Sequence, residues 1–280
     1  MSISGGLHEA LVRGKELECD TIQIFTKSNV QWRARDLTQK EIDLFKQTHE
    51  ETGINPVVAH DTYLINLASP DKEIHRKSVE SFIMELCRSE AIGLRHLVMH
   101  PGAHMDKGEK WGLKHIAASL NTVFETTRGT SVQVLLETTA GQGSNLGYRF
   151  EHLAEIIDMV HEPERVAVCY DTCHAFAAGY DICTEKTYNA TMHEFDRVVG
   201  LEKLKVFHLN DAKNGLGSRV DRHEHIGKGR LGLDAFRFVL SDARFKNAPK
   251  IIETPKGKTK GRSWDEVNLA TLRGLLKKKS

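Results

Sequence analysis

Six apolar segments of this 280-residue chain each end on a residue type that binds transition metals. The segments end at His60, His100, Glu137, Asp171, His208 and Glu253. A single such ending means little, because buried strands commonly run out into polar residues at the protein surface. Six endings at similar intervals indicate a shared site. Imidazole and carboxylate are ligands that zinc prefers, so the pattern predicts a polynuclear metal centre.

Three further residues of ligand type stand beyond strand ends, namely His174 in DTCH and Asp221 with His223 in SRVDRHEH. The full set of His, Asp and Glu residues suffices for about three metal ions with three or four ligands each. So histidine-rich a set favours zinc over magnesium or calcium, and it leaves manganese and iron open. The chain contains no GxSxG, P-loop or GxGxxG motif, so neither a serine nucleophile nor a nucleotide cofactor is indicated.

The remaining histidines fall mainly in helical patterns, and we interpret them as packing or surface residues. His104 and His225 stand close to ligand positions, and we keep both outside the set of metal ligands. The five cysteines are odd in number and scattered, so we expect them to be reduced and to serve in packing.

The segments between the apolar runs have the spacing of amphipathic helices that cover a sheet. They lie near residues 38–52, 72–92, 109–128, 150–161, 186–199 and 264–277. Strand then helix in repetition predicts parallel strands, and the carboxyl ends of parallel strands in a barrel converge on one face. The sequence therefore predicts one domain over residues 1–280, an α/β TIM (β/α)8 barrel with its metal site at the carboxyl-terminal face.

The segment TIQIF at 21–25 is a seventh predicted strand, whereas a closed barrel of this type has eight. The eighth should precede the helix predicted for GGLHEALVRGKELE, where only Met1 to Ser4 stand. We therefore expect a first strand that is truncated or missing. Our hypothesis is that the sequence begins a few residues inside the natural protein.

Composition narrows the class of protein. Hydrophobic residues make up 40%, no apolar stretch approaches the roughly 20 residues that cross a bilayer, and the N-terminus lacks the apolar core of a signal peptide. We expect a cytoplasmic monomer that contacts no membrane. The net charge of +1 lacks the overall excess of basic residues that is typical of nucleic-acid-binding proteins. Divalent ions at the predicted carboxylates would nevertheless make the site locally positive and attractive to phosphate.

Several long motifs resemble the endonuclease IV family of apurinic/apyrimidinic endonucleases, the AP endonuclease 2 family. They are HDTYLINLA from His60, HPGAH from His100, LETTAGQGSNLG around Glu137, VCYDTCHAFAAGYD around Asp171 and HLNDAKNGLGSRVDRHEHIGKGRLG from His208. The resemblance implies a zinc-dependent deoxyribonuclease of DNA repair, which hydrolyses the phosphodiester bond 5′ to abasic sites in duplex DNA and leaves a 3′-hydroxyl. It also implies 3′-phosphatase or 3′-phosphodiesterase activity on blocked 3′ ends.

The resemblance distributes the nine ligands over three zinc ions. The first ion would be held by His60, His100 and Glu137, the second by Glu137, Asp171, His208 and Glu253, and the third by His174, Asp221 and His223. Glu137 would bridge the first two ions, and we count Glu137 and Glu253 as catalytic residues. Two ions placed in this way can share a hydroxide and direct it in line at phosphorus.

Contacts with DNA are implied for the loops after two strands. Tyr63 lies where the family inserts a side chain into DNA, and Trp32 and Arg33 match a family loop that touches DNA. Val30 departs from the family, because an inserting arginine is expected at its position. The basic runs at 256–262 and 277–279 are further candidates for phosphate contact, although solvation is the commoner fate of such runs.

The residues leave two alternatives to a repair nuclease. A sugar isomerase or epimerase of the same barrel architecture could bind a single manganese or magnesium through Glu137, Asp171, His208 and Glu253. Such an enzyme has no use for the other five ligands. A DNA-binding protein without catalysis would be favoured if a bridging or pairing ligand were missing, and none is.

Overall fold

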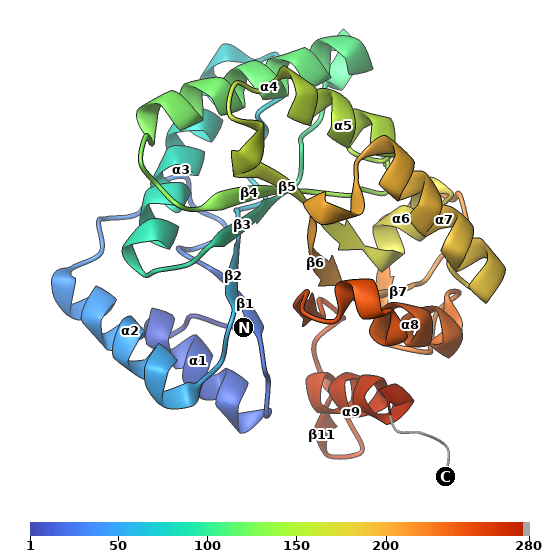
Figure 1. The fold of residues 1–280 in the computed structure, drawn as a ribbon. Helices are drawn as coiled ribbons and strands as arrows, with labels where there is room; N and C mark the ends of the chain where they lie inside the picture. The colour runs from blue at the N-terminus through green and yellow to red at the C-terminus, as the bar shows by residue number, and fades with distance from the viewer. Residues whose placement is uncertain (277–280) are drawn as a thin grey trace.

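Seven parallel strands form one curved sheet at the centre of the molecule (Figure 1). The computed structural model describes residues 1–276, so the basic run at 277–279 lies outside the described residues. Neighbouring strands follow the order β1-β2-β3-β4-β5-β6-β9. Their bounds are β1 Ile22–Phe25, β2 Val57–His60, β3 His96–Met99, β4 Gln133–Glu137, β5 Val166–Asp171, β6 Leu204–His208 and β9 Lys250–Ile251.

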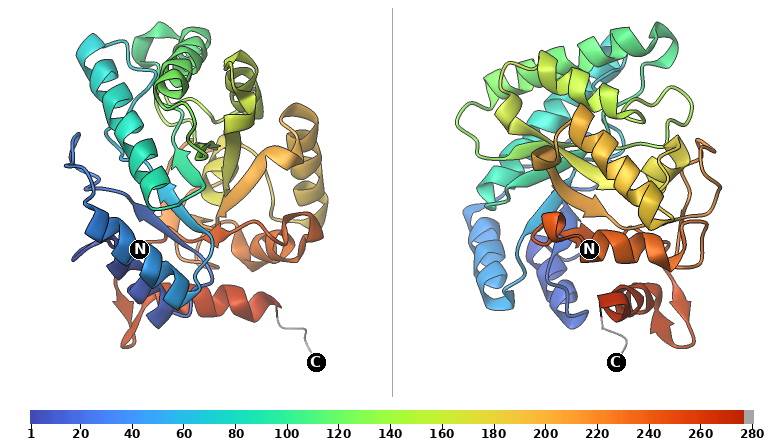
Figure 2. Two further views of the ribbon diagram at one scale, coloured as in Figure 1. Left: turned by 60° about the vertical axis from the view of Figure 1, so that its left-hand side comes forward. Right: turned by 45° about the vertical axis from the view of Figure 1, so that its right-hand side comes forward.

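Helices surround the sheet on its outer side (Figure 2). Their bounds are α1 Leu7–Glu16, α2 Gln39–Thr52, α3 Lys72–Ala91, α4 Glu109–Thr126, α5 Phe150–Met159, α6 Thr172–Ala178, α7 Glu185–Val198, α8 Gly232–Ser241 and α9 Trp264–Leu276. Short 3-10 turns are η1 Met105–Lys107, η2 Pro163–Arg165, η3 Leu201–Lys203 and η4 Ala243–Phe245. The six predicted helical segments correspond to α2, α3, α4, α5, α7 and α9. Helices α6 and α8 are additional to that prediction.

The strands are buried on both faces, which explains why they read as continuous apolar runs. Most apolar side chains lie between the sheet and the helices, in one large core. A separate small cluster fills the inside of the barrel, and its members are Val58, Val98, Leu135, Ala167, Cys169, Val206 and Ile251. This inner cluster forms the floor on which any site at the barrel mouth must rest.

Local sequence signals set the loops at that mouth. Thr38 and Glu41 form a capping box at the start of α2, so the loop after β1 stays outside the helix up to residue 38. After β5 there is no loop at all, because the Asp171 carboxylate accepts a hydrogen bond from the His174 amide at 2.8 Å and caps α6 directly. Strand end and helix start therefore present ligand types side by side.

The barrel is open between β9 and β1, the two ends of the sheet. Strand β9 pairs with β6 only through Phe207↔Lys250 and His208↔Ile251. A cavity of about 890 Å³ lies between β9 and β1, lined by residues 1–3, by β1 and by residues 251–256. The amino group of Met1 donates a hydrogen bond to the carbonyl of Gln23 at the edge of β1. The prediction of a TIM barrel with an incomplete first strand is confirmed.

Two short hairpins lie outside the barrel. Strands β7 Asp211–Ala212 and β8 His223–Glu224 pair antiparallel beyond β6, and this pairing brings residues 221–223 back towards the mouth. Strands β10 Lys258–Thr259 and β11 Arg262–Ser263 form the second hairpin, which contains most of the basic run at 256–262. Among residues 1–276, no helix is long and apolar enough to cross a membrane.

Candidate metal centre

The inner face of the barrel leads directly to the predicted ligands. Side chains two residues apart on a strand point to the same face. Val58 inside the barrel precedes His60 by two positions, and Leu135 precedes Glu137 in the same way. The same spacing joins four further members of the inner cluster to His100, Asp171, His208 and Glu253. Strand alternation therefore carries all six strand-end ligands to one place.

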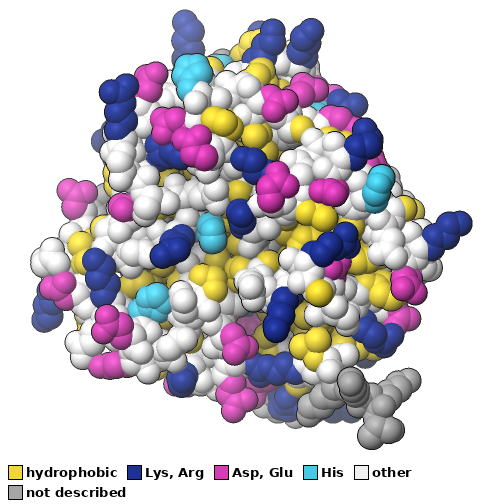
Figure 3. Space-filling view, viewed as in Figure 1, with side chains coloured by type: hydrophobic (Ala, Val, Ile, Leu, Met, Phe, Trp, Pro, Cys, Tyr) yellow, Lys and Arg dark blue, Asp and Glu magenta, His cyan; other side chains and the backbone are white. Residues whose placement is uncertain are grey.

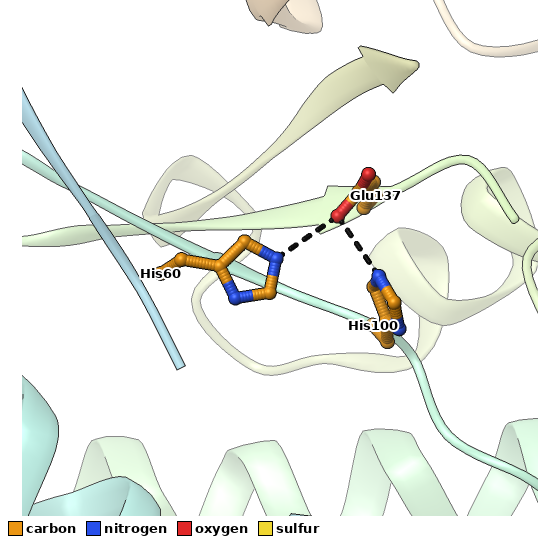
Figure 4. Close-up of side chains that lie close together, drawn as sticks. All are labelled: His60, His100 and Glu137. Atoms are coloured by element: carbon orange, nitrogen blue, oxygen red, sulfur yellow. Dashed lines mark hydrogen bonds and ion pairs between the residues drawn. The ribbon is translucent and has the colours of Figure 1, made fainter. Parts of the chain in front are cut away.

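Glu137 at the end of β4 lies at the centre of the cluster and is fully buried. Its Oε2 lies 3.1 Å from His60 Nε2 and 3.2 Å from His100 Nε2, as Figure 4 shows. Its Oε1 lies 3.0 Å from His208 Nδ1 and 3.2 Å from His174 Nδ1. Because the two oxygens face different histidines, one carboxylate joins two groups of potential ligands.

The first two groups have the membership that the family resemblance implies. Ligand atoms of His60, His100 and Glu137 lie within 4.8 Å of one another, and so do those of Glu137, Asp171, His208 and Glu253. In the second group, His208 Nδ1 is 3.2 Å from Glu253 Oε2 and 3.9 Å from Asp171 Oδ2. Both groups share Glu137.

The third group differs in one member from the predicted set. Asp171, His174 and His223 have ligand atoms within 4.8 Å of one another. Asp221 adds an oxygen on the outer side, 3.2 Å from His174 Nε2 and 3.7 Å from His223 Nε2. Asp171 thus faces both the second and the third group, because it ends β5 and caps α6 at once.

Hydrogen bonds to backbone carbonyls decide which imidazole nitrogens can bind a metal. A carbonyl only accepts, so an Nδ1 facing one must carry the proton and leave Nε2 as a lone pair. His60 Nδ1 faces the Asp61 carbonyl at 2.7 Å, His174 Nδ1 faces that of Thr138 at 2.9 Å, and His223 Nδ1 faces that of Glu253 at 3.2 Å. In this arrangement the Nε2 atoms of all three rings are acceptors.

These acceptors point at one another. His174 Nε2 and His223 Nε2 are 3.2 Å apart, and Asp221 Oδ1 lies 3.2 Å from the former. Three converging acceptors repel unless a cation or an extra proton lies among them. The residues therefore fit a divalent metal with imidazole and carboxylate ligands, which is the donor set of zinc sites.

The pKa shifts of Glu137 and His60 show that the buried carboxylates of the cluster favour positive charge beside them. Burial opposes ionisation of Glu137, yet His208 and His100 hold the pKa of its carboxyl well below the usual value. Burial likewise opposes protonation of His60, yet hydrogen bonds to Asp61 and Glu137 raise its pKa well above the usual value. Protons on the imidazoles and metal cations are alternative ways to compensate the same carboxylates.

The histidines and cysteines that we kept outside the ligand set have other contacts. His104 Nδ1 accepts a hydrogen bond from the Gly108 amide at 3.0 Å. The His225 ring stacks on Trp264 with ring centroids 3.6 Å apart. Burial raises the pKa of the Cys173 thiol, which disfavours a thiolate ligand there. All five cysteines are free thiols in the structure.

The three candidate DNA contacts lie in different environments. Tyr63 is 63% exposed, and its ring centroid lies 6.3 Å from that of His100 at the edge of the cluster. Trp32 packs partly buried against the main core. Arg33 is exposed and pairs with Glu80 of α3 at 3.3 Å. Val30 is 75% exposed in the same loop as Trp32 and Arg33.

Two supporting residues escaped the sequence predictions. Asn210 donates to Asp171 Oδ2 at 2.6 Å and accepts from the Glu253 amide at 2.7 Å, so it joins two ligand segments. Gln23 of β1 contacts both His208 and Glu253. The available signals were weak: a polar residue inside the apolar run TIQIF, and an Asn two residues after a ligand.

Comparison with known proteins gives a consistent result. Residues 11–277 match the AP endonuclease 2 family, described as a xylose isomerase-like TIM barrel. The probable endonuclease 4 of Geotalea daltonii is 49% identical over 279 residues, which cover 100% of this chain and 97% of that protein. That of Geobacter sulfurreducens is 48% identical over 280 residues, covering 100% and 94%.

Solved structures agree on the fold. Endonuclease IV from Thermus thermophilus matches with a TM-score of 0.86 and 35% identity, covering 97% of this chain and 94% of that one. A D-psicose 3-epimerase from Clostridium cellulolyticum matches with a TM-score of 0.69 and 16% identity, covering 97% and 94%. The second likeness concerns the barrel alone.

Proposed function

Since the chain belongs to the endonuclease IV family, also named AP endonuclease 2, we propose that it is a DNA repair endonuclease that hydrolyses the phosphodiester bond 5′ to abasic sites in duplex DNA and leaves a 3′-hydroxyl. One observation carries the proposal beyond family membership. Eight side chains of the predicted types form three groups at the barrel mouth, Asp221 adjoins the third, and one buried carboxylate joins the first two. A phosphodiesterase could use metal ions in all three groups, to activate water and to neutralise charge on the phosphate ester.

We propose that about three zinc ions bind there. The first would be held by His60, His100 and Glu137, the second by Glu137, Asp171, His208 and Glu253, and the third by His174, Asp221 and His223. Asp171 faces the third group as well and is placed to share in it. Bound divalent ions lower the pKa of water and neutralise charge that develops on a phosphate ester.

The chain's own catalytic residues have separate tasks. Each oxygen of Glu137 is engaged by imidazoles, so Glu137 holds the cluster together and is not free to attack phosphorus. The Glu253 side chain is 22% exposed, with Oε2 directed into the cluster. Burial opposes ionisation of its carboxyl, yet His208 lowers the pKa, so Oε2 is placed as an ionised ligand for a metal ion that would activate a water molecule. Water, rather than a side chain, is the nucleophile.

The rim of the site suits a duplex that has lost a base. Among residues 1–276, four large apolar side chains are exposed outside the α-helices, each in a loop or short turn at the carboxyl ends of the strands. They are Val30 at 75%, Tyr63 at 63%, Met105 at 52% and Leu216 at 49% exposure. Apolar side chains inserted between base steps kink DNA, and a missing base lowers the cost of opening the stack. These exposed apolar side chains support duplex DNA as the substrate.

Metal ions in the site would themselves attract phosphate. Basic and acidic side chains are interspersed over the face shown in Figure 3, in keeping with the net charge of +1. We expect DNA affinity to fall as salt is added, because protein groups that neutralise phosphates release counterions. Affinity that stays constant from low to high salt would argue against a surface that grips the DNA backbone.

We also propose that the enzyme trims 3′-phosphate and other 3′-blocking groups, because these present the same ester to the same cluster. All nine ligands belong to one chain, so the site needs no second subunit, and we propose a monomer with one catalytic domain. Acting on DNA, it would work inside the cell without membrane contact.

Incision of a duplex with a single abasic site tests the proposal, run beside elemental analysis of the purified protein. We expect cleavage 5′ to the lesion, loss of activity with a chelator and restoration by zinc. The quartet around Glu137 and His208 also suits a single-metal sugar epimerase. One metal per chain, no incision and turnover of a ketose would identify that enzyme instead.

A further inference from the structure

Gln23 lies beside the second ligand group, on the strand that borders the open side of the barrel. It is 8% exposed and stands second in β1. Its Oε1 lies 2.7 Å from His208 Nε2, and its Nε2 donates to Glu253 Oε1 at 2.7 Å. One amide therefore contacts two of the four ligands in this group.

The directions of these two hydrogen bonds follow from the chemistry of the partners. A carboxylate accepts only, so the NH2 group of Gln23 faces Glu253 and its oxygen faces His208. That oxygen requires a proton on His208 Nε2. His208 Nδ1 is then a lone pair, directed at Glu137 Oε1 at 3.0 Å and Glu253 Oε2 at 3.2 Å.

His208 differs in this respect from the other oriented histidines. His60, His174 and His223 are each held by a backbone carbonyl, which no substitution removes. His208 is held by a side chain, and it offers Nδ1 rather than Nε2 to the cluster. The tautomer of this ligand therefore depends on the identity of residue 23.

Glu253 also needs the support that Gln23 provides. It follows β9, whose pairing with β6 stops at Ile251, and it faces the cavity between β9 and β1. The amide of Glu253 bonds Asn210, but within residues 1–276 no strand pairs with this segment on the open side. The bond from Gln23 to Oε1 spans that gap and leaves Oε2 directed at the cluster.

We propose that Gln23 is a positioning residue for the metal held by the second group, which selects the His208 tautomer and fixes Glu253 across the open side of the barrel. This rests on the proposed function, since it presumes a metal among Glu137, Asp171, His208 and Glu253. Outer hydrogen bonds to metal ligands typically change metal affinity by roughly 10- to 100-fold, and we expect an effect of that order here.

The test compares Gln23→Met, which keeps length but removes both hydrogen bonds, with Gln23→Glu, which keeps the acceptor for His208 but places a charge beside Glu253. Gln133→Met is the matched control, because Gln133 begins β4 at the opposite end of the barrel and its side chain bonds the Glu164 carbonyl. Zinc affinity is measured by competition with a chromophoric chelator, and the second site is followed by the visible absorption of bound cobalt.

We expect Gln23→Met to bind one of its metal ions roughly 10- to 100-fold more weakly and to change the cobalt spectrum, with kcat reduced and KM for DNA unchanged. The metal affinity and kcat of Gln23→Glu should lie between those of Gln23→Met and the wild type. Gln133→Met should have the metal affinity, cobalt spectrum and kcat of the wild type. Full retention of every metal ion and an unchanged spectrum in Gln23→Met would overturn the role of Gln23.

A measurement on the unmodified protein keeps the inference testable if Gln23→Met fails to fold. Nitrogen-15 NMR of imidazole in the zinc-loaded wild type should show His208 protonated at Nε2, and protonation at Nδ1 would refute the inference. A wild-type protein that binds no zinc would instead refute the proposed function. The two failures are therefore distinguishable.

Discussion

Strand β3 has a histidine at each end, and their surroundings are opposite. His100 follows the carboxyl end of the strand and lies 3.2 Å from the buried Glu137. His96 begins the strand, and burial together with Lys205 and Arg95 lowers its pKa to about 4. At the carboxyl end of the barrel, burial opposes protonation, yet Asp61 and Glu137 raise the pKa of His60 well above the usual value. Cys169, Glu253 and Glu137 do the same for His208.

The difference follows from strand direction rather than from residue type. Parallel strands bring all their carboxyl ends together, so the acidic side chains at these ends lie close to one another. Their negative charges act together on the neighbouring imidazoles. The same strands bring Arg95 and Lys205 near His96 at the amino end. Identical imidazoles are therefore placed to bind a metal at one end of the barrel and are neutral packing groups at the other.

Replacing Glu137 by Gln should have the largest effect on this contrast. The substitution keeps size but removes the charge that joins two ligand groups, so we expect incision to fall by roughly 1,000-fold or more. Zinc content should drop at both groups. Glu164→Gln, the same change in η2 at the amino end, is the control and should leave kcat and zinc content intact. Near-normal incision by Glu137→Gln would refute the proposal that Glu137 joins the first and second metal-binding groups.

Asp221→Asn should have a smaller effect because Asp221 is an outer member of the cluster. Its side chain is 41% exposed, and its carboxylate faces the two histidines of the third group. We expect about a 100-fold loss of kcat and the loss of one zinc, with the other two retained. Asp234→Asn on the exposed surface of α8 serves as control. If Asp221→Asn lost all its zinc, the division into inner and outer groups would be wrong.

The convergence of the six strand-end side chains could be predicted because strand alternation acts over two residues. Val58 and His60 share a face whatever the rest of the chain does. His174 follows from the same local chemistry, since Asp171 caps the helix that carries it. The barrel itself follows from repeated strand and helix patterns.

Gln23 and Asn210 could not be predicted because their roles depend on distance in space. Gln23 meets Glu253 across 230 residues of chain and across the open side of the barrel. No local pattern in TIQIF encodes that contact. Asp221 was predicted from its motif rather than from the strand pattern, and its place near His174 depends on the β7–β8 hairpin. The role of Asp171 in the third group appears only when β5 and α6 are seen to be continuous.

Tyr63 lies at the exposed edge of the cluster, so its substitution should affect DNA binding rather than metal binding. Tyr63→Ala should raise KM for abasic DNA about tenfold with zinc content unchanged, because contact of an aromatic ring with a base is worth about 1–3 kcal/mol. Tyr63→Phe should behave as the wild type, since the ring rather than the hydroxyl makes the contact. Equal KM values for all three proteins would remove Tyr63 from the DNA surface.

The smallest predicted effect lies at the amino end and concerns stability rather than activity. The pKa of His96 is about 4 in the folded protein and 6.5 is its ordinary value, so the unfolded chain binds more protons between these pH values. The contribution of His96 to the free energy of unfolding should therefore be complete above pH 6.5 and should be lost as pH falls towards 4. Because His96 is only partly buried, we expect about 1 kcal/mol between pH 7 and 5.

His96→Gln should flatten this decline without changing kcat, which urea unfolding at about pH 7 and about pH 5 would measure. Loss of zinc on acidification affects the wild type and the variant alike, so the difference between their slopes isolates His96. His161→Gln, at an exposed position, should keep the wild-type slope. If His96→Gln and the wild type declined equally, the amino end would carry no electrostatic strain, and the contrast between the two ends of β3 would rest on the carboxylates alone.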